Sequence, residues 1–266
     1  MTKEATVLSI AGSDPSGGAG IQADVKTIAS IGVYGAAAIT CITVQNSKGV
    51  QQIHSLPPQL VEAQIMAVIE DHLVTHIKIG MVGTIEIAKC IGKILQEFDG
   101  IALYDPVLAA TTGESLLHKD TIQILKHSLL PYVQYLTPNR DELSILSGHT
   151  ISSLNSALRS GRELLATFSN LEGLIVKGGH LKENEKEIGD YLLLQTGGMI
   201  VSKRKRINIS NLHGTGCTFS SAFTSFLCMG DTPDTALQNS GEYMDRVIRS
   251  GVSRKIAQSG DNGPLQ

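Results

Sequence analysis

Short runs of apolar, often β-branched residues alternate with helical patterns along most of this chain of 266 residues. Such runs are typical of strands buried on both faces. Between them, apolar residues recur every three or four positions, as at Ile21, Val25 and Ile28, which indicates amphipathic helices. Because strands that alternate with helices build a mostly parallel sheet covered on both faces, we expect an α/β fold. The predicted buried strands are 6–10, 37–44, 77–79, 101–104, 133–136 and 174–176.

The pattern changes in the last third of the chain. Two strand-like runs within 187–205 flank the turn residues Thr196, Gly197 and Gly198, which predicts a hairpin at one edge of the sheet. The basic run at 203–206 is typical of a charged edge strand. Helices are predicted over 217–229 and 233–250. Since no repeat or linker interrupts the chain, we expect a single domain over residues 1–266.

Composition narrows the class of partner. Charged residues make up 18% of the chain, the net charge is −3 and no long basic face is present, so neither nucleic acid nor an anionic membrane is expected as a partner. The four cysteines lack zinc-site spacing, and the first residues do not resemble a signal peptide. No apolar run reaches the length of a spanning helix. We therefore expect a cytoplasmic protein with reduced thiols that binds small molecules.

Polar residues and glycines stand where the predicted strands end. In open α/β sheets the ligand site lies at the carboxyl ends of the strands. The residues at these ends are Gly12, Gln45, Gly80, Asp105, Asn139 and Lys177.

Two glycine-rich turns, at 12–20 and 211–220, each precede a helical pattern. Gly214 and Gly216 can adopt backbone angles that let consecutive N–H groups point at an anion, while the following helix supplies its positive end. No Walker motif and no GxGxxG after the first strand offers another phosphate site. The pair of turns predicts a bipartite site for a phosphorylated ligand. A plain capped turn is the alternative.

Carboxylate and amide oxygens follow two of the strands. Asp105 precedes a proline, and Asn139 is followed three residues later by Glu142. Such oxygens suit Mg²⁺, which proteins hold through few ligands, several waters and nucleotide phosphates. In the alternative interpretation, Asn139 caps a helix that begins at Arg140 and Glu142 favours its first turn.

Three further side chains are candidates for binding the two substrates, one for phosphate groups and two for a heterocycle. Lys177 ends a strand before two glycines, so its ammonium could reach phosphate oxygens, although a solvated lysine is the commoner case. Thr43 and Gln45 share one strand face, and an amide that donates and accepts suits a heterocycle edge. A capped strand end is the alternative.

Cys217 stands where the second glycine turn becomes a helix. A helix N-terminus lowers the pKa of a thiol, so Cys217 is the candidate base or acceptor-positioning group. The alternative is a small buried hydrophobe, which we assign to Cys41, Cys90 and Cys228. His213 adjoins the turn and is expected to orient it.

Seven motifs in order resemble the hydroxymethylpyrimidine and phosphomethylpyrimidine kinases of thiamine biosynthesis, within the ribokinase-like superfamily. The resemblance runs nearly from end to end and implies a three-layer α/β/α fold, MgATP as phosphoryl donor and a homodimer. The motifs are AGSDPSGGAGIQAD (11–24), TVQNSKGV (43–50), KIGM (78–81), DPV (105–107), TPNRDE (137–142), VKGGH (176–180) and HGTGCTFSSA (213–222).

The resemblance also implies roles for individual residues. It places the anion hole at Gly214, Thr215, Gly216 and Cys217, with His213 beside it, and the nucleotide and metal side at Asp105, Asn139, Glu142 and Lys177. Sugar kinases of the superfamily carry a catalytic Asp where this chain has Cys217. The implied pyrimidine pocket comprises Gly12, Ala19, Asp24, Thr43, Gln45, Met81 and Val107.

The resemblance implies two successive phosphorylations of 4-amino-5-hydroxymethyl-2-methylpyrimidine. We expect Cys217 to assist mainly the first, because the second nucleophile is an ionised phosphate. A pyridoxal or pyridoxine kinase is the nearest rival, but such relatives often have Met-Asp where this chain has Gln45 and Asn46. A ligand-binding protein without turnover and a plain nucleotide-binding module are the rivals from other classes. Thr111, where the family commonly has Lys, favours the former.

Overall fold

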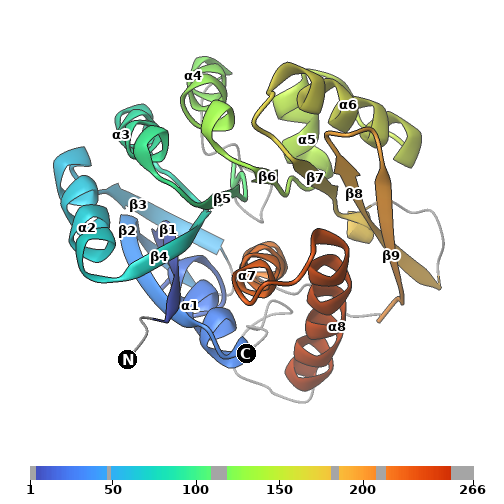
Figure 1. Cartoon of the computed structure of the whole chain (residues 1–266), viewed down its shortest axis with the longest axis horizontal. Coiled ribbons are helices and arrows are strands. Elements are labelled where there is room, and N and C mark those ends of the chain that lie inside the picture. Colours follow the sequence, from blue (N-terminus) through green and yellow to red (C-terminus); the bar gives the residue numbers. More distant parts are fainter. Residues whose placement is uncertain (1–3, 47–48, 109–118, 181–185, 208–213, 253–266) are drawn as a thin grey trace.

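The computed structural model describes residues 4–46, 49–108, 119–180, 186–207 and 214–252. Across these residues the strands form one nine-stranded sheet in the order β3-β2-β1-β4-β5-β6-β7-β8-β9 (Figure 1). The strands are β1 (Ala5–Ser13), β2 (Tyr34–Asn46), β3 (Gly49–Ser55), β4 (Leu73–Ile79), β5 (Ile101–Tyr104), β6 (Tyr135–Leu136), β7 (Gly173–Val176), β8 (Glu187–Leu194) and β9 (Met199–Lys205).

The centre of the sheet is parallel and both edges are antiparallel. β2, β1, β4, β5, β6 and β7 pair in parallel, whereas β3 pairs antiparallel with β2 and β8 with β7 and β9. The mostly parallel sheet and the edge hairpin over 187–205 confirm the predictions. The predicted strand 133–136 is wrong in length, because only its last two residues pair. β3 was not predicted.

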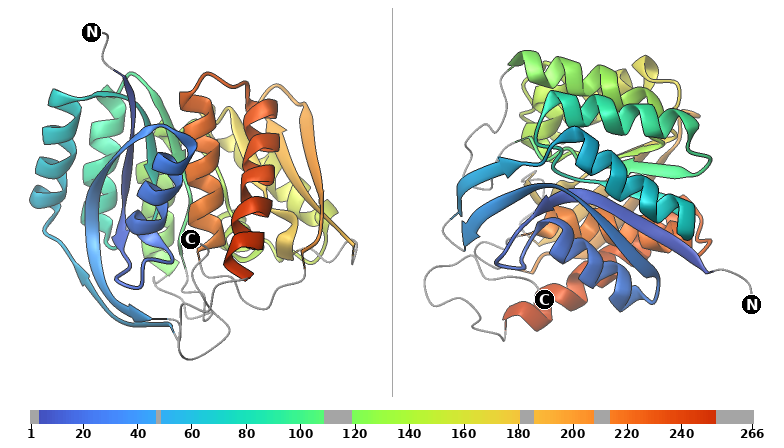
Figure 2. Two further views of the ribbon diagram at one scale, coloured as in Figure 1. Left: turned by 90° about the horizontal axis from the view of Figure 1, so that it is seen from below. Right: turned by 90° about the vertical axis from the view of Figure 1, so that its left-hand side faces the viewer.

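Helices cover both faces of the sheet, so the three-layer α/β/α prediction is confirmed (Figures 1 and 2). One face carries α2 (Pro58–Asp71), α3 (Ile85–Glu97), α4 (Lys119–Leu129), α5 (Arg140–Ser147) and α6 (Leu154–Thr167). The other carries α1 (Gly20–Ile31), α7 (Thr215–Cys228) and α8 (Pro233–Val252). Two 3-10 turns, at Leu130–Tyr132 and Gly178–His180, complete the described elements.

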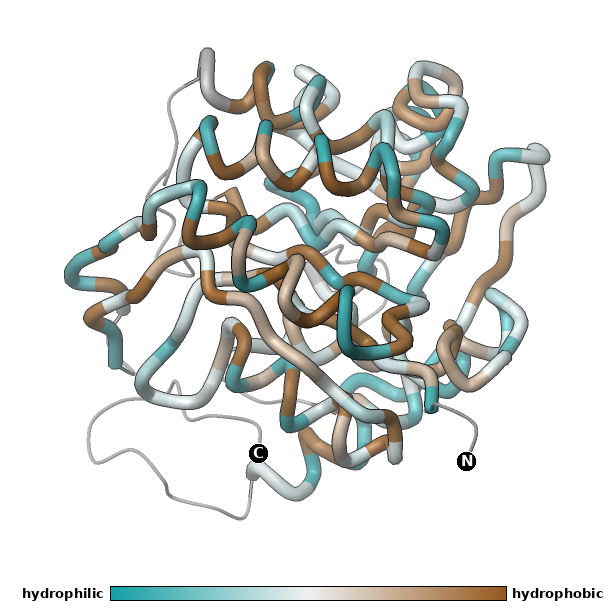
Figure 3. Tube along the Cα trace, turned by 60° about the vertical axis from the view of Figure 1, so that its left-hand side comes forward, coloured by the Kyte–Doolittle hydropathy of each residue, from teal (hydrophilic) through white to brown (hydrophobic). Residues whose placement is uncertain are grey.

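Alternate residues of the central strands enter opposite cores. In β7, Leu174 and Val176 pack into the larger apolar cluster beneath α3 to α6, while Ile175 packs against α7 and α8 with Phe223. Burial on both faces is why β7 is apolar throughout. The helices instead alternate between apolar and polar residues along the chain (Figure 3), as expected when only one side is buried.

The strand order reverses beside β1. From β1 the chain passes through α1 to β2 on one side, and later enters β4 on the other side. The carboxyl ends at such a reversal are where open α/β sheets bind ligands. Gly12 near the end of β1 and Met81 just after β4 therefore lie at the favoured position.

Among the helices that the structure describes, none combines the length and the apolar character needed to cross a membrane. All strands described join the same sheet. A single domain over the whole chain stays a prediction.

Candidate active site

The two glycine-rich turns lie against each other, although about two hundred residues separate them in the sequence. Gly214 has a φ of 83° and precedes the first turn of α7. A Cβ added there would lie 1.8 Å from the carbonyl oxygen of Gly18 and 3.3 Å from the Cα of Ala19. Only glycine allows this backbone angle and this approach together. The start of α7, with its unpaired N–H groups, thus adjoins the first glycine-rich turn.

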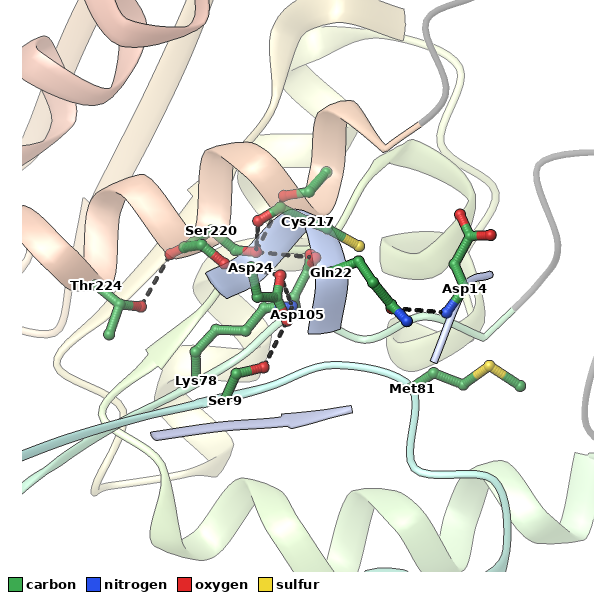
Figure 4. Close-up of polar contacts among 12 residues, drawn as sticks. Ser9, Asp14, Gln22, Asp24, Lys78, Met81, Asp105, Cys217, Ser220 and Thr224 are labelled. Carbon is green, nitrogen blue, oxygen red and sulfur yellow. Dashed lines mark hydrogen bonds and ion pairs between the residues drawn. The ribbon is translucent and has the colours of Figure 1, made fainter. Parts of the chain in front are cut away.

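Asp14 shapes the first glycine-rich turn from inside. Its carboxylate accepts hydrogen bonds from the Ser16 N–H (2.9 Å), the Ser16 hydroxyl (2.7 Å) and the Ala19 N–H (2.8 Å). The Asp14 N–H donates to the side chain of Gln22 at 2.9 Å (Figure 4). Gly20 has a φ of 57°, and a Cβ there would lie 2.2 Å from the oxygen of Gly12. The turn is therefore held rigidly where it meets α7.

Asp105 and Lys177, predicted from strand ends, form an ion pair beneath the second turn. Lys177 Nζ donates to Asp105 Oδ1 at 3.1 Å, and Thr137 Oγ1 donates to the same oxygen at 2.9 Å. A Cβ on Gly216 would lie 3.5 Å from Lys177 Nζ and 3.7 Å from Asp105 Oδ2. Burial alone would raise the pKa of Asp105, but the positive charges of Lys177 and then Lys78 hold it below its usual value. The pair is ionised.

Asn139 and Glu142 form a capping box at the start of α5. The Asn139 side chain accepts from the N–H groups of Asp141 and Glu142, both at 2.9 Å, and Glu142 Oε2 accepts from the Asn139 N–H at 2.7 Å. The capping interpretation is confirmed. Burial raises the pKa of Glu142 to about 8, with Lys177 opposing the shift and Asp105 adding to it.

The same carboxylates fit a divalent cation held jointly with phosphates. The charge of Asp105 raises the pKa of Glu142, and the positive charge of Lys177 lowers the pKa of both carboxyl groups. A cation would offset both the burial that chiefly keeps Glu142 protonated and the smaller repulsion from Asp105. Within the described residues, no group of three or more His, Cys, Asp or Glu could hold a metal alone. This agrees with Mg²⁺, which is usually bound through one or two carboxylates plus substrate phosphates.

The hairpin of β2 and β3 brings Thr43 and Gln45 to the end of β1. Thr43 Oγ1 donates to the carbonyl oxygen of Ser13 at 2.9 Å and to Gln45 Oε1 at 3.2 Å. The two side chains thus share a face, as predicted. Gly12 lies beside Met81, since a Cβ on Gly12 would come within 3.5 Å of the Met81 sulfur.

Ala19 and Val107, which the resemblance places in the pyrimidine pocket, are both half-buried. Ala19 is half-buried and precedes α1 as its N-cap. Val107 is half-buried just after Asp105, whose carbonyl oxygen accepts from the Val107 N–H at 2.9 Å.

Asp24 lies in the interior between α1, the sheet and α7. It has no exposed surface, and its carboxylate accepts from Lys78 (2.9 Å to each oxygen), Ser221 (2.8 Å) and Ser9 (2.7 Å). Protein groups therefore hold both carboxylate oxygens. The contact of Asp24 with a pyrimidine that the family resemblance implies stays a prediction.

The prediction that the pKa of the Cys217 thiol is lowered was wrong. Burial raises the pKa of Cys217 to about 11, even though Lys78 lowers it. Desolvation disfavours the thiolate more strongly than the positive neighbour and the helix N-terminus favour it. Cys217 is therefore a protonated thiol at neutral pH, next to the two glycine turns.

Two residues named from the sequence, His213 and Thr111, lie outside the described residues.

Sequence reasoning missed several polar side chains inside the site. The signal for Lys78 was a charge between Ile77 and Ile79 in a buried strand, and for the two serines a pair of adjacent hydroxyls on a helix that lacks charged residues. The missed residues are Ser9, Asp14, Gln22, Lys78, Ser220 and Ser221.

Comparison with known proteins gives consistent relatives. The family described as phosphomethylpyrimidine kinase matches residues 14–265. A hydroxymethylpyrimidine/phosphomethylpyrimidine kinase of Rhizobium meliloti is 38% identical over 265 residues, which cover 98% of this chain and 96% of the relative.

Solved structures show the same likeness. The phosphomethylpyrimidine kinase of Clostridium difficile superposes with a TM-score of 0.79 at 35% identity, covering 92% of this chain and all of that one. A Staphylococcus aureus pyridoxal kinase in complex with ADP gives 0.87 at 27% identity, covering 100% of this chain and 94% of that chain. With a family match over nearly its whole length and a relative at 38% identity, the chain belongs to the phosphomethylpyrimidine kinase family.

Proposed function

We propose that this protein phosphorylates hydroxymethylpyrimidine to its monophosphate and then to its diphosphate, with ATP as the phosphoryl donor. Family membership makes it a phosphotransferase of thiamine biosynthesis, and its relatives carry both activities in their names. A similar kinase has been solved with ADP, which supports ATP as the donor.

One observation carries the proposal: the contact between the two glycine-rich turns, with an ion pair beside it. The approach of Gly214 to Gly18 joins the start of α7 to the turn between β1 and α1, and Lys177 and Asp105 lie next to Gly216. Backbone N–H groups at a helix start and a lysine ammonium both stabilise a transferring phosphoryl group. A protein that bound no phosphorylated ligand would have no use for these anion-binding groups.

The acceptor is expected on the other side of the turns. Gln45 offers an amide beside Thr43, and Met81 and Gly12 lie at the neighbouring strand ends. A side-chain amide both donates and accepts hydrogen bonds, as the ring nitrogen and amino group of an aminopyrimidine require. The acceptor hydroxyl would then face the start of α7.

The chemistry consists mainly of positioning and charge neutralisation. The first acceptor is an alcohol and the second an ionised phosphate, so a strong base is dispensable in at least the second step. Lys177 and the α7 amides stabilise charge on the phosphoryl oxygens. We propose that Asp105 and Glu142 hold Mg²⁺, which neutralises phosphate charge when bound. Asn139 holds Glu142 in place through the capping box.

A paired product assay tests the proposal. The protein is incubated with MgATP and either hydroxymethylpyrimidine or pyridoxal, and the products are resolved by mass. We expect pyrimidine monophosphate followed by diphosphate. Absence of product from either acceptor, with ATP still bound, would favour a binding protein without turnover.

Pyridoxal kinase is the second candidate, because one specific observation favours it. The S. aureus pyridoxal kinase covers the entire chain at a TM-score of 0.87. Its identity is 27%, against 38% for the R. meliloti pyrimidine kinase. The higher identity favours the pyrimidine, and pyridoxal phosphate as sole product would reverse this order.

We also propose a homodimer in the cytoplasm. The outer face of the β2–β3 hairpin exposes Ile42 (48%) and Val44 (42%), opposite His54 and Gln52 of β3. Apolar side chains gathered on an exposed strand face are typical of subunit contacts. The four free thiols suit a reducing compartment.

A further inference from the structure

A lysine lies at the centre of the molecule with no exposed surface. Lys78 interrupts the apolar strand β4 between Ile77 and Ile79, and its Nζ lies 2.9 Å from each carboxylate oxygen of Asp24 (Figure 4). Burial of two charges is costly even when they are paired. Burial would lower the pKa of Lys78, but the charge of Asp24, and more weakly that of Asp105, raises it instead.

The carboxylate of Asp24 connects three elements through its remaining hydrogen bonds. Ser9 of β1 donates to Oδ2 at 2.7 Å, and Ser221 of α7 donates to Oδ1 at 2.8 Å. The neighbouring Ser220 donates to Asp105 Oδ2 at 3.0 Å. Two adjacent serines thus anchor the second turn of α7 to two buried carboxylates, Asp24 of α1 and Asp105 just after β5.

We propose that Lys78 is a positioning residue for phosphoryl transfer: by holding Asp24 in place against Ser221, it fixes the direction in which the first turn of α7 presents its N–H groups. This inference rests on the proposed function, in which those N–H groups face the transferred phosphoryl group. Lys78 itself touches neither substrate.

The physical basis is the steep dependence of transfer on geometry. Preorganised N–H groups stabilise the transition state only if they are already aimed where charge develops. A displacement of about 1 Å can cost about 100-fold in rate. Interactions formed mainly in the transition state affect kcat much more than KM. A loosened α7 should therefore lower kcat with little change in the binding of either substrate.

Two matched serine variants test the link to α7. Ser221→Ala and Ser9→Ala each remove one fully buried hydroxyl from the same carboxylate, but only Ser221 is on α7. We expect Ser221→Ala to lower kcat by about tenfold or more, with the KM of each substrate within about twofold of the wild-type value. In Ser9→Ala we expect a clearly smaller fall in kcat, although its Tm should fall by a similar amount. Equal kcat losses in the two variants would overturn the proposal.

A second measurement does not depend on kinase activity. The charges that influence the Cys217 thiol come from Lys78 on β4, Asp24 on α1, Asp105 after β5 and Lys177 after β7. Against the dominant effect of burial, Lys78 lowers the pKa of Cys217 and Asp24 raises it. The rate of Cys217 alkylation by iodoacetamide at pH near 9 is followed by peptide mass spectrometry. We expect it to fall in Lys78→Met and to rise in Asp24→Asn.

Loosening of the structure alone would raise the alkylation rate in both variants, and that outcome overturns the inference. Because one unpaired buried charge can unfold a protein, Asp24→Asn/Lys78→Met is measured alongside the single variants. The double variant should fold and lose kcat by about tenfold or more with KM retained. Wild-type kcat in the folded double variant would also overturn the proposal. A further outcome separates the two proposals. If the Cys217 alkylation rate falls in Lys78→Met and rises in Asp24→Asn as expected, but the wild-type protein phosphorylates neither acceptor, the proposed function alone is contradicted.

Discussion

Cys217 shows how burial can change the role of a residue that the sequence places correctly. The thiol stands at the start of α7, but burial raises its pKa to about 11, so it carries its proton at neutral pH. A protonated thiol cannot accept a proton from an alcohol. We therefore expect Cys217 to contribute shape and a weak hydrogen bond to the site instead of acting as a base.

For Cys217→Ala we accordingly expect similar losses in the two phosphorylation steps, each smaller than about tenfold, because no base is removed. Single-turnover rates with hydroxymethylpyrimidine and with its monophosphate provide the measurement. A loss of about 100-fold or more confined to the alcohol would show that Cys217 acts as the base after all.

Gly214 offers a sharper test of the contact between the glycine turns. In Gly214→Ala, the new Cβ would meet the Gly18 oxygen at 1.8 Å, so the turns must separate. We expect kcat to fall by about 100-fold or more. Gly230→Ala is the matched control: Gly230 has a comparable φ of 93°, but nothing lies within 4 Å of its Cβ position. It should cost about 1 kcal/mol of stability and retain activity. Equal activity of the two variants would contradict the importance of the contact.

At the scale of elements, α5 combines a structural and a ligand-related function at its first residues. Asn139→Ala removes the side-chain acceptor of two N–H groups at the start of α5. Ser153→Ala likewise removes the side-chain acceptor of an N–H group in the capping box of α6. Each should lose about 1 kcal/mol of unfolding free energy. Only Asn139→Ala should also raise KM for MgATP, because Glu142 lies beside Asp105 and Lys177. An unchanged KM would leave Asn139 as a cap alone.

The elements that sequence periodicity predicts are those buried on both faces. β5 and β7 consist of apolar residues throughout, and their predicted bounds agree with the structure to within one residue. β3 was missed because its residues, among them Gln51, Gln52 and His54, are exposed and it depends on β2 for its hydrogen bonds. Burial of Lys78 and Asp24 could not be predicted either, because the two charges are far apart in the sequence and compensate only in the folded protein.

The whole molecule should lose stability in mild acid through a group remote from the site. His76 is 8% exposed, its Nε2 has no hydrogen-bond partner among the described residues, and burial lowers its pKa to about 4. The unfolded chain, with a histidine pKa near 6.5, therefore binds more protons between these values. Stability is full above pH 6.5 and falls as the pH drops, by at most about 3 kcal/mol for this group.

Urea unfolding at several pH values between 7 and 4.5 measures this loss. In His76→Gln the slope of unfolding free energy against pH should be smaller over this range. An identical slope in the variant would assign the acid sensitivity to other groups.

Assembly supplies the last prediction at this scale. Ile42→Lys/Val44→Lys places two charges on the outer face of β2, where both side chains are exposed in the single chain. We expect the variant to be monomeric by light scattering with an unchanged Tm at low concentration, because no core contact is lost. A dimer that persists would place the subunit contact elsewhere.

The contact between Gly18 and Gly214 also has a consequence for the chain while it is being made. A growing polypeptide that has reached β9 already contains every strand of the described sheet, along with Thr43, Gln45 and Met81. It still lacks α7, the partner of the first glycine turn. Such a nascent chain could hold an acceptor but has nowhere to stabilise the phosphoryl group. We therefore expect catalytic competence to arrive only once α7 has been synthesised.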